Sequence, residues 1–347
     1  MKLKLDRGIG AALAAALLFG AGTPVAKLLL AHTNPWMLAA LLYLGSGIGL
    51  WLLRRVRGAA AVRPSGREWG WLAGATLAGG VVGPVLLMFG LSAMPATRAS
   101  LLLNAEGVLT ALLAWFVFKE NFDRRIALGM LAIVAGAVVL SWPGEGSMRL
   151  DLAALAVLGA CLAWAIDNNL TRKVSLTDAS FIAMVKGLAA GATNLLLAWQ
   201  LGAAWPAAST LAAAAVLGFL SYGASLVLFV VALRQLGTAR TGAYFSVAPF
   251  FGALLGVAVL HEPVTVPLLA AGALMTLGVW LHLTESHGHQ HTHEPTEHAH
   301  EHSHDSHHQH EHPAGVPTGA RHTHPHAHVA LTHSHRHFPD AHHRHTH

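Results

Sequence analysis

Long apolar runs, separated by short polar or Gly/Pro-containing breaks, follow one another along the first 283 residues. A helix needs about 20 predominantly apolar residues to cross the hydrocarbon core of a bilayer. By this criterion the expected fold class is an all-α integral membrane protein with ten transmembrane helices and short connections. The predicted helices cover residues 8–30, 35–54, 69–91, 97–118, 125–142, 151–172, 179–200, 209–233, 239–260 and 264–283.

Composition supports the same class of protein. The chain has 347 residues, of which 54% are hydrophobic and only 11% charged, whereas soluble domains carry about 25% charged residues. The net charge of +5 does not indicate a nucleic-acid partner, because basic residues of membrane proteins gather in cytoplasmic loops. The lipid bilayer is therefore the expected partner. With Cys161 as the single cysteine, an internal disulfide is excluded.

The first apolar run resembles a signal peptide, because the basic segment MKLKLDR precedes it. The apolar character resumes after Pro24 and continues to Ala31, which is long enough to span a membrane. We therefore interpret this run as a retained first helix.

Basic residues are distributed unequally between the two ends of the predicted helices. With the N-terminus in the cytoplasm, fifteen Lys and Arg residues fall on cytoplasmic ends, against Lys27, Arg98 and Arg149 outside. Cytoplasmic loops carry the excess of positive charge. The sequence thus predicts a multi-pass protein of the cytoplasmic (inner) membrane with both termini in the cytoplasm.

The two halves of the predicted bundle resemble each other. A shift of 142 residues lays LLNAEGVLTALLAWFVFKEN over YFSVAPFFGALLGVAVLHEP without a gap, matching Glu120 with Glu262 and Arg98 with Arg240. A shift of 145 lays FGAGTPVAK over WAIDNNLTR. Five helices per half is an odd number, so the second half enters the membrane in the opposite sense. This inverted repeat is typical of secondary transporters.

Ten helices in two halves, with an ALLAWxxxxE helix end in the first, resemble the EamA family of the drug/metabolite transporter superfamily. The resemblance covers residues 8–283 and divides the chain into residues 1–143, 150–283 and a tail, 284–347. It implies a permease, usually an exporter of small metabolites, and no enzyme. The family's proline in the fourth helix is present as Pro249, but the first half has Gly107 there, preceded by Glu106. This departure predicts an atypical substrate.

Motifs agree with a carrier that is neither an ATPase nor an enzyme. No GxxxxGK[ST], HExxH or GxSxG motif occurs in the sequence, although phosphate-binding loops and hydrolase sites carry such motifs. The sequence is compatible with a homodimer and does not define the oligomeric state.

Charged residues inside membrane spans are costly and are functional candidates by default. Glu106 is in the middle of the fourth predicted helix, close to Asn104, and could accept a proton or a cation; alternatively it forms a structural ion pair. Lys186 in the seventh helix is the expected partner, although it could also snorkel to the surface. The remaining candidates for the substrate or ion pathway are polar residues of the sixth and first helices: Asp167, Asn168 and Lys27. Alternatively, Asp167 and Asn168 belong to an interfacial helix end with local pairing to Arg172.

The tail, residues 284–347, is rich in histidine. It contains 23 of the chain's 26 histidines, mostly spaced as H-x-H, and few large apolar residues. Such a segment cannot bury a core, so we expect it to be disordered. Imidazole is a common ligand of Ni, Co and Zn. The expected metal ligands are His302, His304, His307, His308, His310, His312, His322, His324, His326 and His328.

Two hypotheses about transport follow. In the first, the protein exports divalent Ni, Co or Zn, or a metal-linked solute, and the tail captures metal while the membrane carboxylates accept the ion or a counter-moving proton. In the second, it exports an amino acid, drug or other organic metabolite, and the tail stores or senses metal. Three further hypotheses are a pH-sensing or lipid-binding tail, a tail without a role, and a membrane metal-binding protein that transports nothing. No cofactor is required by any of them.

Overall fold

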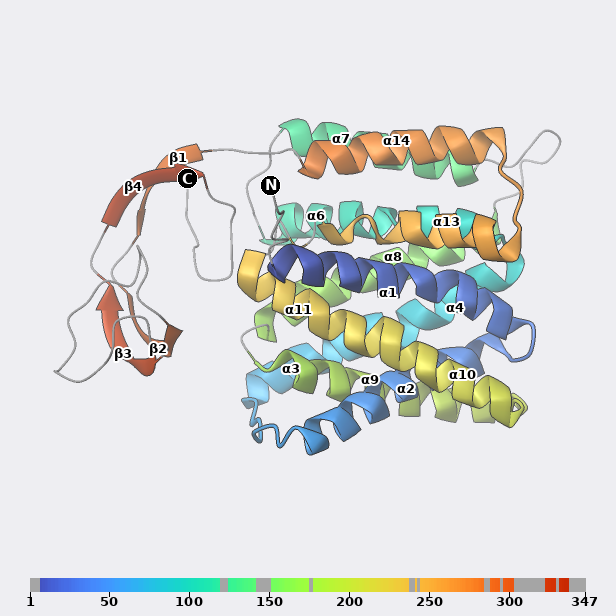
Figure 1. Ribbon diagram of the computed structural model, residues 1–347, viewed down its shortest axis with the longest axis horizontal. Coiled ribbons are helices and arrows are strands. Elements are labelled where there is room, and N and C mark those ends of the chain that lie inside the picture. Colours follow the sequence, from blue (N-terminus) through green and yellow to red (C-terminus); the bar gives the residue numbers. More distant parts are fainter. Residues whose placement is uncertain are drawn as a thin grey trace. The chain divides into compact units, whose positions relative to one another are not determined.

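The computed structural model describes residues 7–118, 124–141, 151–174, 177–236, 241, 244–283, 288–293, 296–302, 322–328 and 331–336. The chain divides into two compact units, Met1–Glu285 and Ser286–His347. The first unit is a bundle of helices and the second contains short strands (Figure 1).

The described helices of the bundle follow the predicted apolar runs. They are α1 (Arg7–Leu30), α2 (Pro35–Val56), α3 (Gly66–Ala75), the π-helix η1 (Thr76–Val82), α4 (Gly83–Ala93), α5 (Ala96–Leu102), α6 (Ala105–Phe118), α7 (Arg124–Ser141), α8 (Leu152–Thr171), the 3-10 helix η2 (Arg172–Val174), α9 (Ala179–Gln200), α10 (Ala208–Gly218), the π-helix η3 (Phe219–Ala224), α11 (Ser225–Leu236), α13 (Ala248–Leu260) and α14 (Val266–Leu283).

Six stretches of the described chain are long and apolar enough to cross a membrane. They are Gly8–Leu30, Pro35–Val56, Gly66–Ala93, Leu152–Thr171, Ala179–Gln200 and Ala208–Ala232. The apolar helices of the other predicted spans are shorter, and two of these spans are interrupted. A turn at residues 103–104 separates α5 from α6, and a turn at residues 246–247 precedes α13.

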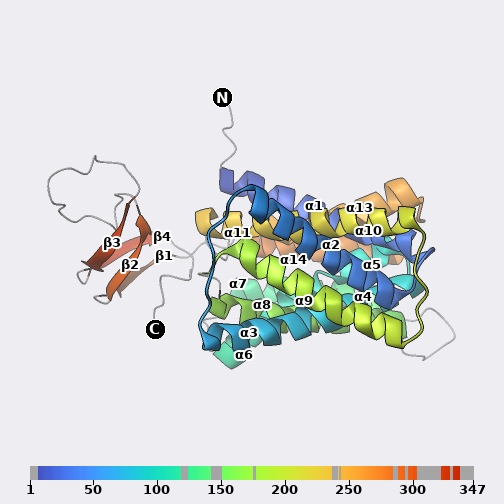
Figure 2. The ribbon, with the colours of Figure 1, turned by 90° about the horizontal axis from the view of Figure 1, so that it is seen from below.

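Glycines allow α2 and α9 to pack against each other at very short range. A Cβ atom on Gly187 would lie 2.6 Å from the backbone nitrogen of Gly47, and one on Gly191 would lie 2.6 Å from the nitrogen of Leu44. In lipid the hydrophobic effect contributes little to helix association, so close backbone contact between small residues provides much of the stabilisation. Elsewhere α7 packs on α14, and α1 packs on α11 and α13 (Figure 2).

An ion pair joins α2 to the start of α9 at one end of the bundle. Arg54 Nη1 lies 2.7 Å from Asp178 Oδ1, and the same carboxylate oxygen accepts hydrogen bonds from the Ser180 hydroxyl and the Phe181 backbone N–H. Burial alone would raise the pKa of Asp178, but these hydrogen bonds and the Arg54 guanidinium outweigh it and lower that pKa. Asp178 is therefore a charged N-cap of α9.

The described part of the second unit contains four strands in two antiparallel pairs. The strand β1 (Gly288–His293) pairs with β4 (Leu331–Arg336), and β2 (Thr296–His302) pairs with β3 (His322–His328). The structure thus differs from the expected disorder in these four segments. The physical reason is their alternation of histidine with other residues, whose period of two matches that of a β-strand.

Substituting Gly187 by Val tests the close packing of α2 on α9. We expect a loss of about 1–3 kcal/mol in stability, because the added side chain would meet the backbone of Gly47. Gly70→Val is the matched control, since a Cβ atom there meets nothing within 4 Å. Thermal unfolding of the detergent-purified variants measures both; equal melting temperatures would contradict the proposed packing.

Candidate functional site

The interruption of the fourth predicted span sets the position of Glu106. The turn at Leu103 and Asn104 ends α5, and Glu106 lies in the first turn of the new helix α6. Backbone N–H groups at a helix start carry partial positive charge and favour a nearby carboxylate. Interrupted helices line the binding sites of many transporters, so the break places an acidic residue where such sites are built.

Two consecutive asparagines of α8 connect α6 with the second half of the chain. Asn168 Nδ2 donates to Glu106 Oε1 at 2.8 Å and lies 3.4 Å from the Thr110 hydroxyl. Asn169 Nδ2 donates to the Thr110 carbonyl at 3.2 Å and to the Ala165 carbonyl at 2.8 Å. The carboxylate of the first half is therefore held by an amide of the second half.

Asp167 and Lys186 form a buried ion pair between α8 and α9. Lys186 Nζ lies 2.5 Å from Oδ1 and 2.6 Å from Oδ2 of Asp167, and both side chains are at most 10% exposed. The Thr171 hydroxyl donates to Asp167 Oδ1 at 2.8 Å. The expectation that Lys186 pairs with Glu106 is wrong, because consecutive helices of one half place Asp167 directly against Lys186.

The π-helix η1 connects this ion pair with aromatic residues. The Gly79 carbonyl accepts hydrogen bonds from the Tyr43 hydroxyl at 2.7 Å and from Trp164 Nε1 at 2.8 Å. A Cβ atom on Gly79 would collide with the Asp167 carboxylate, and one on Gly83 would lie 2.9 Å from Trp164 Nε1. A π-helix bonds i to i+5 and disturbs the regular ladder, a feature frequent at functional sites.

Aromatic rings from both halves meet next to these polar groups. Phe19 contacts Trp164 and Tyr222 with ring centroids 6.2 and 5.9 Å apart, and Tyr43 contacts Tyr222 at 5.3 Å. Phe245 lies 5.5 Å from Phe19. Sequence analysis did not select these residues. The signal that could have found them is Phe19 matching Trp164 in the shift of 145 residues.

The exposure of Asn168 shows that the interior is accessible at this level. Asn168 is exposed, yet it follows the buried residues Trp164 and Cys161 by four and seven positions and so shares their face of α8. The outward face of the helix carries Leu162 and Ile166, which are 44% and 39% exposed. The exposure of Asn168 is therefore toward the space between helices, next to Glu106.

The other two predicted pathway residues have different surroundings. Asn104 is buried against α14, where its Nδ2 lies 3.8 Å from Met275 Sδ. Lys27 Nζ donates to the carbonyls of Leu91 and Ser92 at 2.7 and 3.3 Å, and so caps the end of α4. The structure does not bring Lys27 to Glu106.

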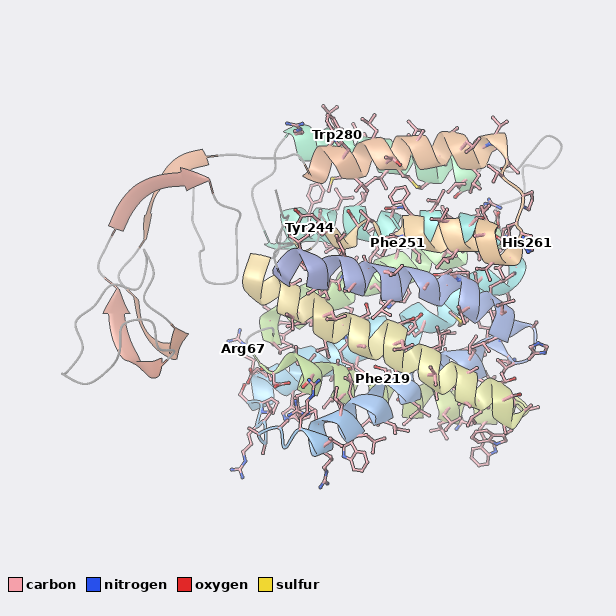
Figure 3. All side chains as sticks on the ribbon, viewed as in Figure 1. Arg67, Phe219, Tyr244, Phe251, His261 and Trp280 are labelled. Atoms are coloured by element: carbon pink, nitrogen blue, oxygen red, sulfur yellow. The ribbon has the colours of Figure 1, made fainter. Side chains whose placement is uncertain are left out.

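The two ends of the bundle differ in charge. Figure 3 shows Arg67 at one end and His261 at the opposite end, where α13 stops. We call these the Arg54 end and the Glu262 end. Glu262 accepts hydrogen bonds from the Ala96 and Thr97 backbone N–H groups at 2.7 and 2.8 Å, and so caps the start of α5. Glu120, its counterpart in the repeat, lies outside the described residues.

Only some of the tail histidines predicted as metal ligands are among the described residues. His304, His307, His308, His310 and His312 lie outside the described residues. The antiparallel registers place histidine opposite histidine at five positions: His289 with His335, His291 with His333, His298 with His326, His300 with His324, and His302 with His322. His328 is opposite Thr296.

An apolar bundle with interrupted helices, and polar groups shared between its two halves, defines a multi-pass membrane transporter. The model of the EamA-like transporter family matches residues 6–142 and again residues 151–284. The chain therefore belongs to the EamA-like transporter family, and the family segment occurs in it twice.

Curated relatives agree with this assignment, and a solved structure has a similar fold. An uncharacterized transporter of Methanothermobacter thermautotrophicus is 28% identical over 285 residues, which cover 77% of this chain and 83% of the relative. The uncharacterized transporter YvbV of Bacillus subtilis is 24% identical over 210 residues, covering 58% and 67%. A crystal structure with 21% identity and a TM-score of 0.63, covering 79% of this chain and 98% of that one, shares the fold.

A double-mutant cycle tests the ion pair. Lys186→Met leaves the Asp167 charge buried without its partner, and we expect a loss of about 3–5 kcal/mol in stability. Asp167→Asn combined with Lys186→Met removes both charges and should recover most of this loss. The free energy of unfolding of each purified variant is measured in detergent. Additive effects of the two substitutions would show that the pair does not act as a unit.

Proposed function

We propose that this protein is a secondary transporter of a small organic solute that carries a protonated amine, and that Glu106 binds the amine. The observation that carries this proposal is the Glu106–Asn168 contact between the two family segments, at a helix interruption and at an accessible point of the interior. Glu106 Oε2 has no hydrogen-bond partner among the described residues, so this oxygen is available to a ligand.

The neighbouring groups favour an organic cation. Asp167 has both carboxylate oxygens bound by Lys186, so its charge is already compensated, whereas Glu106 is bound by a neutral amide. Aromatic faces attract cations, most strongly where water is excluded, and Trp164 precedes Asn168 by one helical turn. A carboxylate beside aromatic rings suits an alkylammonium group. A cargo carboxylate would have to displace Asp167 from Lys186, which disfavours simple zwitterions.

Alternating access follows if the two family segments are inverted repeats. This part of the proposal is supported by irregularities at matching positions: η1 and η3 start at residues 76 and 219, and the interruptions lie at residues 103–104 and 246–247. Each of these pairs is separated by 143 residues, one more than the gap-free shift of the sequence. Two such halves can rock about a site between them. A proton returning to Glu106 would couple export to the proton gradient.

Orientation is a further part of the proposal. The Arg54 end carries Arg55, Arg57, Arg63 and Arg67 in addition to Arg54, and the Glu262 end carries Lys27 and Arg98. By the positive-inside rule the Arg54 end, where α1 begins and α14 ends, faces the cytoplasm. Export would then proceed from the accessible Glu106 toward the Glu262 end.

Transport of amines into liposomes tests this function. A panel of radiolabelled primary and aromatic amines is offered to reconstituted protein, and counterflow is measured. We expect Glu106→Gln to lower the flux at least about tenfold, because a hydrogen bond to a charged group contributes about 1.5–3 kcal/mol. Glu68→Gln is the control, since Gln preserves the capping box with Ser65 at the start of α3. Equal flux in both variants would refute the assigned role of Glu106.

A second candidate function is export of Ni, Co or Zn, and the paired histidines of the tail favour it. Directly opposite residues of an antiparallel pair lie on the same face, with Cβ atoms about 4.5–5.5 Å apart. Histidine opposite histidine is therefore a suitable arrangement for sharing one metal ion. In this second candidate function the tail collects metal at the membrane, and Glu106 accepts the ion during transport.

Metal retained by cells distinguishes the two candidates. Retained metal is measured in cells that are loaded with Ni, Co or Zn and that express the full-length protein, a version ending at Glu285, or the Glu106→Gln variant. Metal export predicts that the full-length protein lowers retained metal, that Glu106→Gln does not, and that truncation causes a partial loss. Unchanged metal in all three strains would eliminate this candidate and leave amine transport as the function.

A further inference from the structure

Three polar residues form a buried line along α5 and the turn that follows it. Thr97, Ser100 and Asn104 are only 2%, 1% and 5% exposed. They follow one another at spacings of three and four residues, which places neighbours on one side of a helix. The line runs from the Glu262 end, where Glu262 accepts the Thr97 N–H, to the interruption just before Glu106.

Two atoms of this line have no hydrogen-bond partner. Ser100 Oγ and Asn104 Oδ1 are both buried and unpaired within the described chain. An unsatisfied buried polar group costs about 1–3 kcal/mol, and each such group in a native structure calls for an explanation. Alanine at position 100 would avoid the penalty there. Their retention suggests that both atoms find partners in another conformation.

Glycines of α1 and α13 cover the line. A Cβ atom on Gly252 would lie 2.5 Å from Ser100 Oγ, and one on Gly256 would lie 2.8 Å from Thr97 Cγ2. Gly20 of α1 is pressed against the Ala248 carbonyl of α13 in the same way. We call the close contact between α5 and α13 the seam. In Figure 3 Phe251 and His261 mark the segment of α13 that leads from the seam to the Glu262 end. The seam leaves no room for a ligand while α13 stays on α5.

Exposure changes abruptly at the interruption. From Ala96 to Ala105 every described residue except Arg98 is buried, whereas Glu106, Leu109 and Thr110 of α6 are partly exposed. Arg98 itself pairs with Asp151 at 2.7 Å and ties α5 to the start of α8. The bundle is thus closed along α5 and accessible along α6, so the structure represents one side of a transport cycle.

We infer that Thr97, Ser100 and Asn104 line the second half of the transport route, which opens toward the Glu262 end when α13 separates from α5. The hydroxyl oxygen of Ser100 and the amide oxygen of Asn104 then accept hydrogen bonds from N–H or O–H groups of the passing solute. This inference deepens the proposed function, because an ammonium group leaving Glu106 would meet these acceptors next. Glu262 is the latch that holds the end of α13 against the start of α5.

Single-cysteine labelling tests the route. The one native cysteine is replaced by Cys161→Ala, and Ser100→Cys or Asn104→Cys is introduced. Ala204→Cys and Ala60→Cys, both exposed and located at the Glu262 and Arg54 ends, identify the two faces of oriented vesicles. Leu162→Cys on the outward face of α8 is a control for reaction through lipid. A membrane-impermeant maleimide is applied to either face, and the modified fraction is measured by mass spectrometry.

We expect Ser100→Cys and Asn104→Cys to react from the face that modifies Ala204→Cys. Adding Gly252→Ala should accelerate the reaction at least about fivefold, because the added methyl group crowds the closed contact between α5 and α13. A fivefold change corresponds to about 1 kcal/mol of destabilisation of the closed conformation. Gly272→Ala, whose Cβ atom would be 3.9 Å from its nearest neighbour on α5, should leave the rate unchanged.

Reaction only from the Ala60→Cys face would overturn the inference, as would no reaction from either face in variants that elute as folded proteins on size exclusion. Thr97→Cys replaces Ser100→Cys if the latter does not elute as a folded protein on size exclusion. The labelling requires no cargo, so failure of amine transport leaves this outcome unaffected. If the labelling shows that the route opens but no amine is transported, the proposed cargo is refuted and the proposed route stands.

Discussion

The cost of holding charge away from water controls the arrangement of this bundle. Asp167 and Lys186 compensate each other across α8 and α9 at 2.5 Å, whereas among the described residues the Glu106 carboxylate accepts a hydrogen bond from the neutral amide of Asn168 and lies at the start of a helix. An uncompensated carboxylate inside a membrane protein is expensive unless it serves a ligand or a proton. This difference between the two acidic residues is the reason for proposing Glu106, and not Asp167, as the cargo-binding carboxylate.

Glycine determines how closely the elements around these charges approach. Gly79 leaves space for the Asp167 carboxylate and presents its carbonyl to Tyr43 and Trp164. Gly252 lets α13 seal the buried hydroxyl of Ser100. The same property serves two purposes, because the missing side chain positions a charge in one case and lets α13 approach α5 in the other. Close packing without side chains also allows helices to separate and return without repacking a side-chain interface.

The two halves contribute unequal chemistry to one site. By the sequence shifts, Gly22 corresponds to Asp167, and Ala248 corresponds to Glu106. Each half thus supplies one acidic residue at a position where the other half has a small residue. Aromatic residues, in contrast, come from both halves and contact one another, as Phe19 and Trp164 do. In the proposed function, a nearly symmetric framework rocks between two conformations while a single asymmetric site selects the cargo.

The sequence by itself determined the membrane class, the apolar segments and the family, and it singled out Glu106 as a candidate, because apolar length and isolated charges are local properties that a bilayer constrains strongly. It could not assign partners. Only the tertiary structure decided that Lys186 binds Asp167, that Asn168 reaches Glu106, and that Lys27 caps α4. These contacts depend on which helices are neighbours and on interruptions and π-turns that rotate side chains, and neither is encoded in the hydrophobic pattern of one segment.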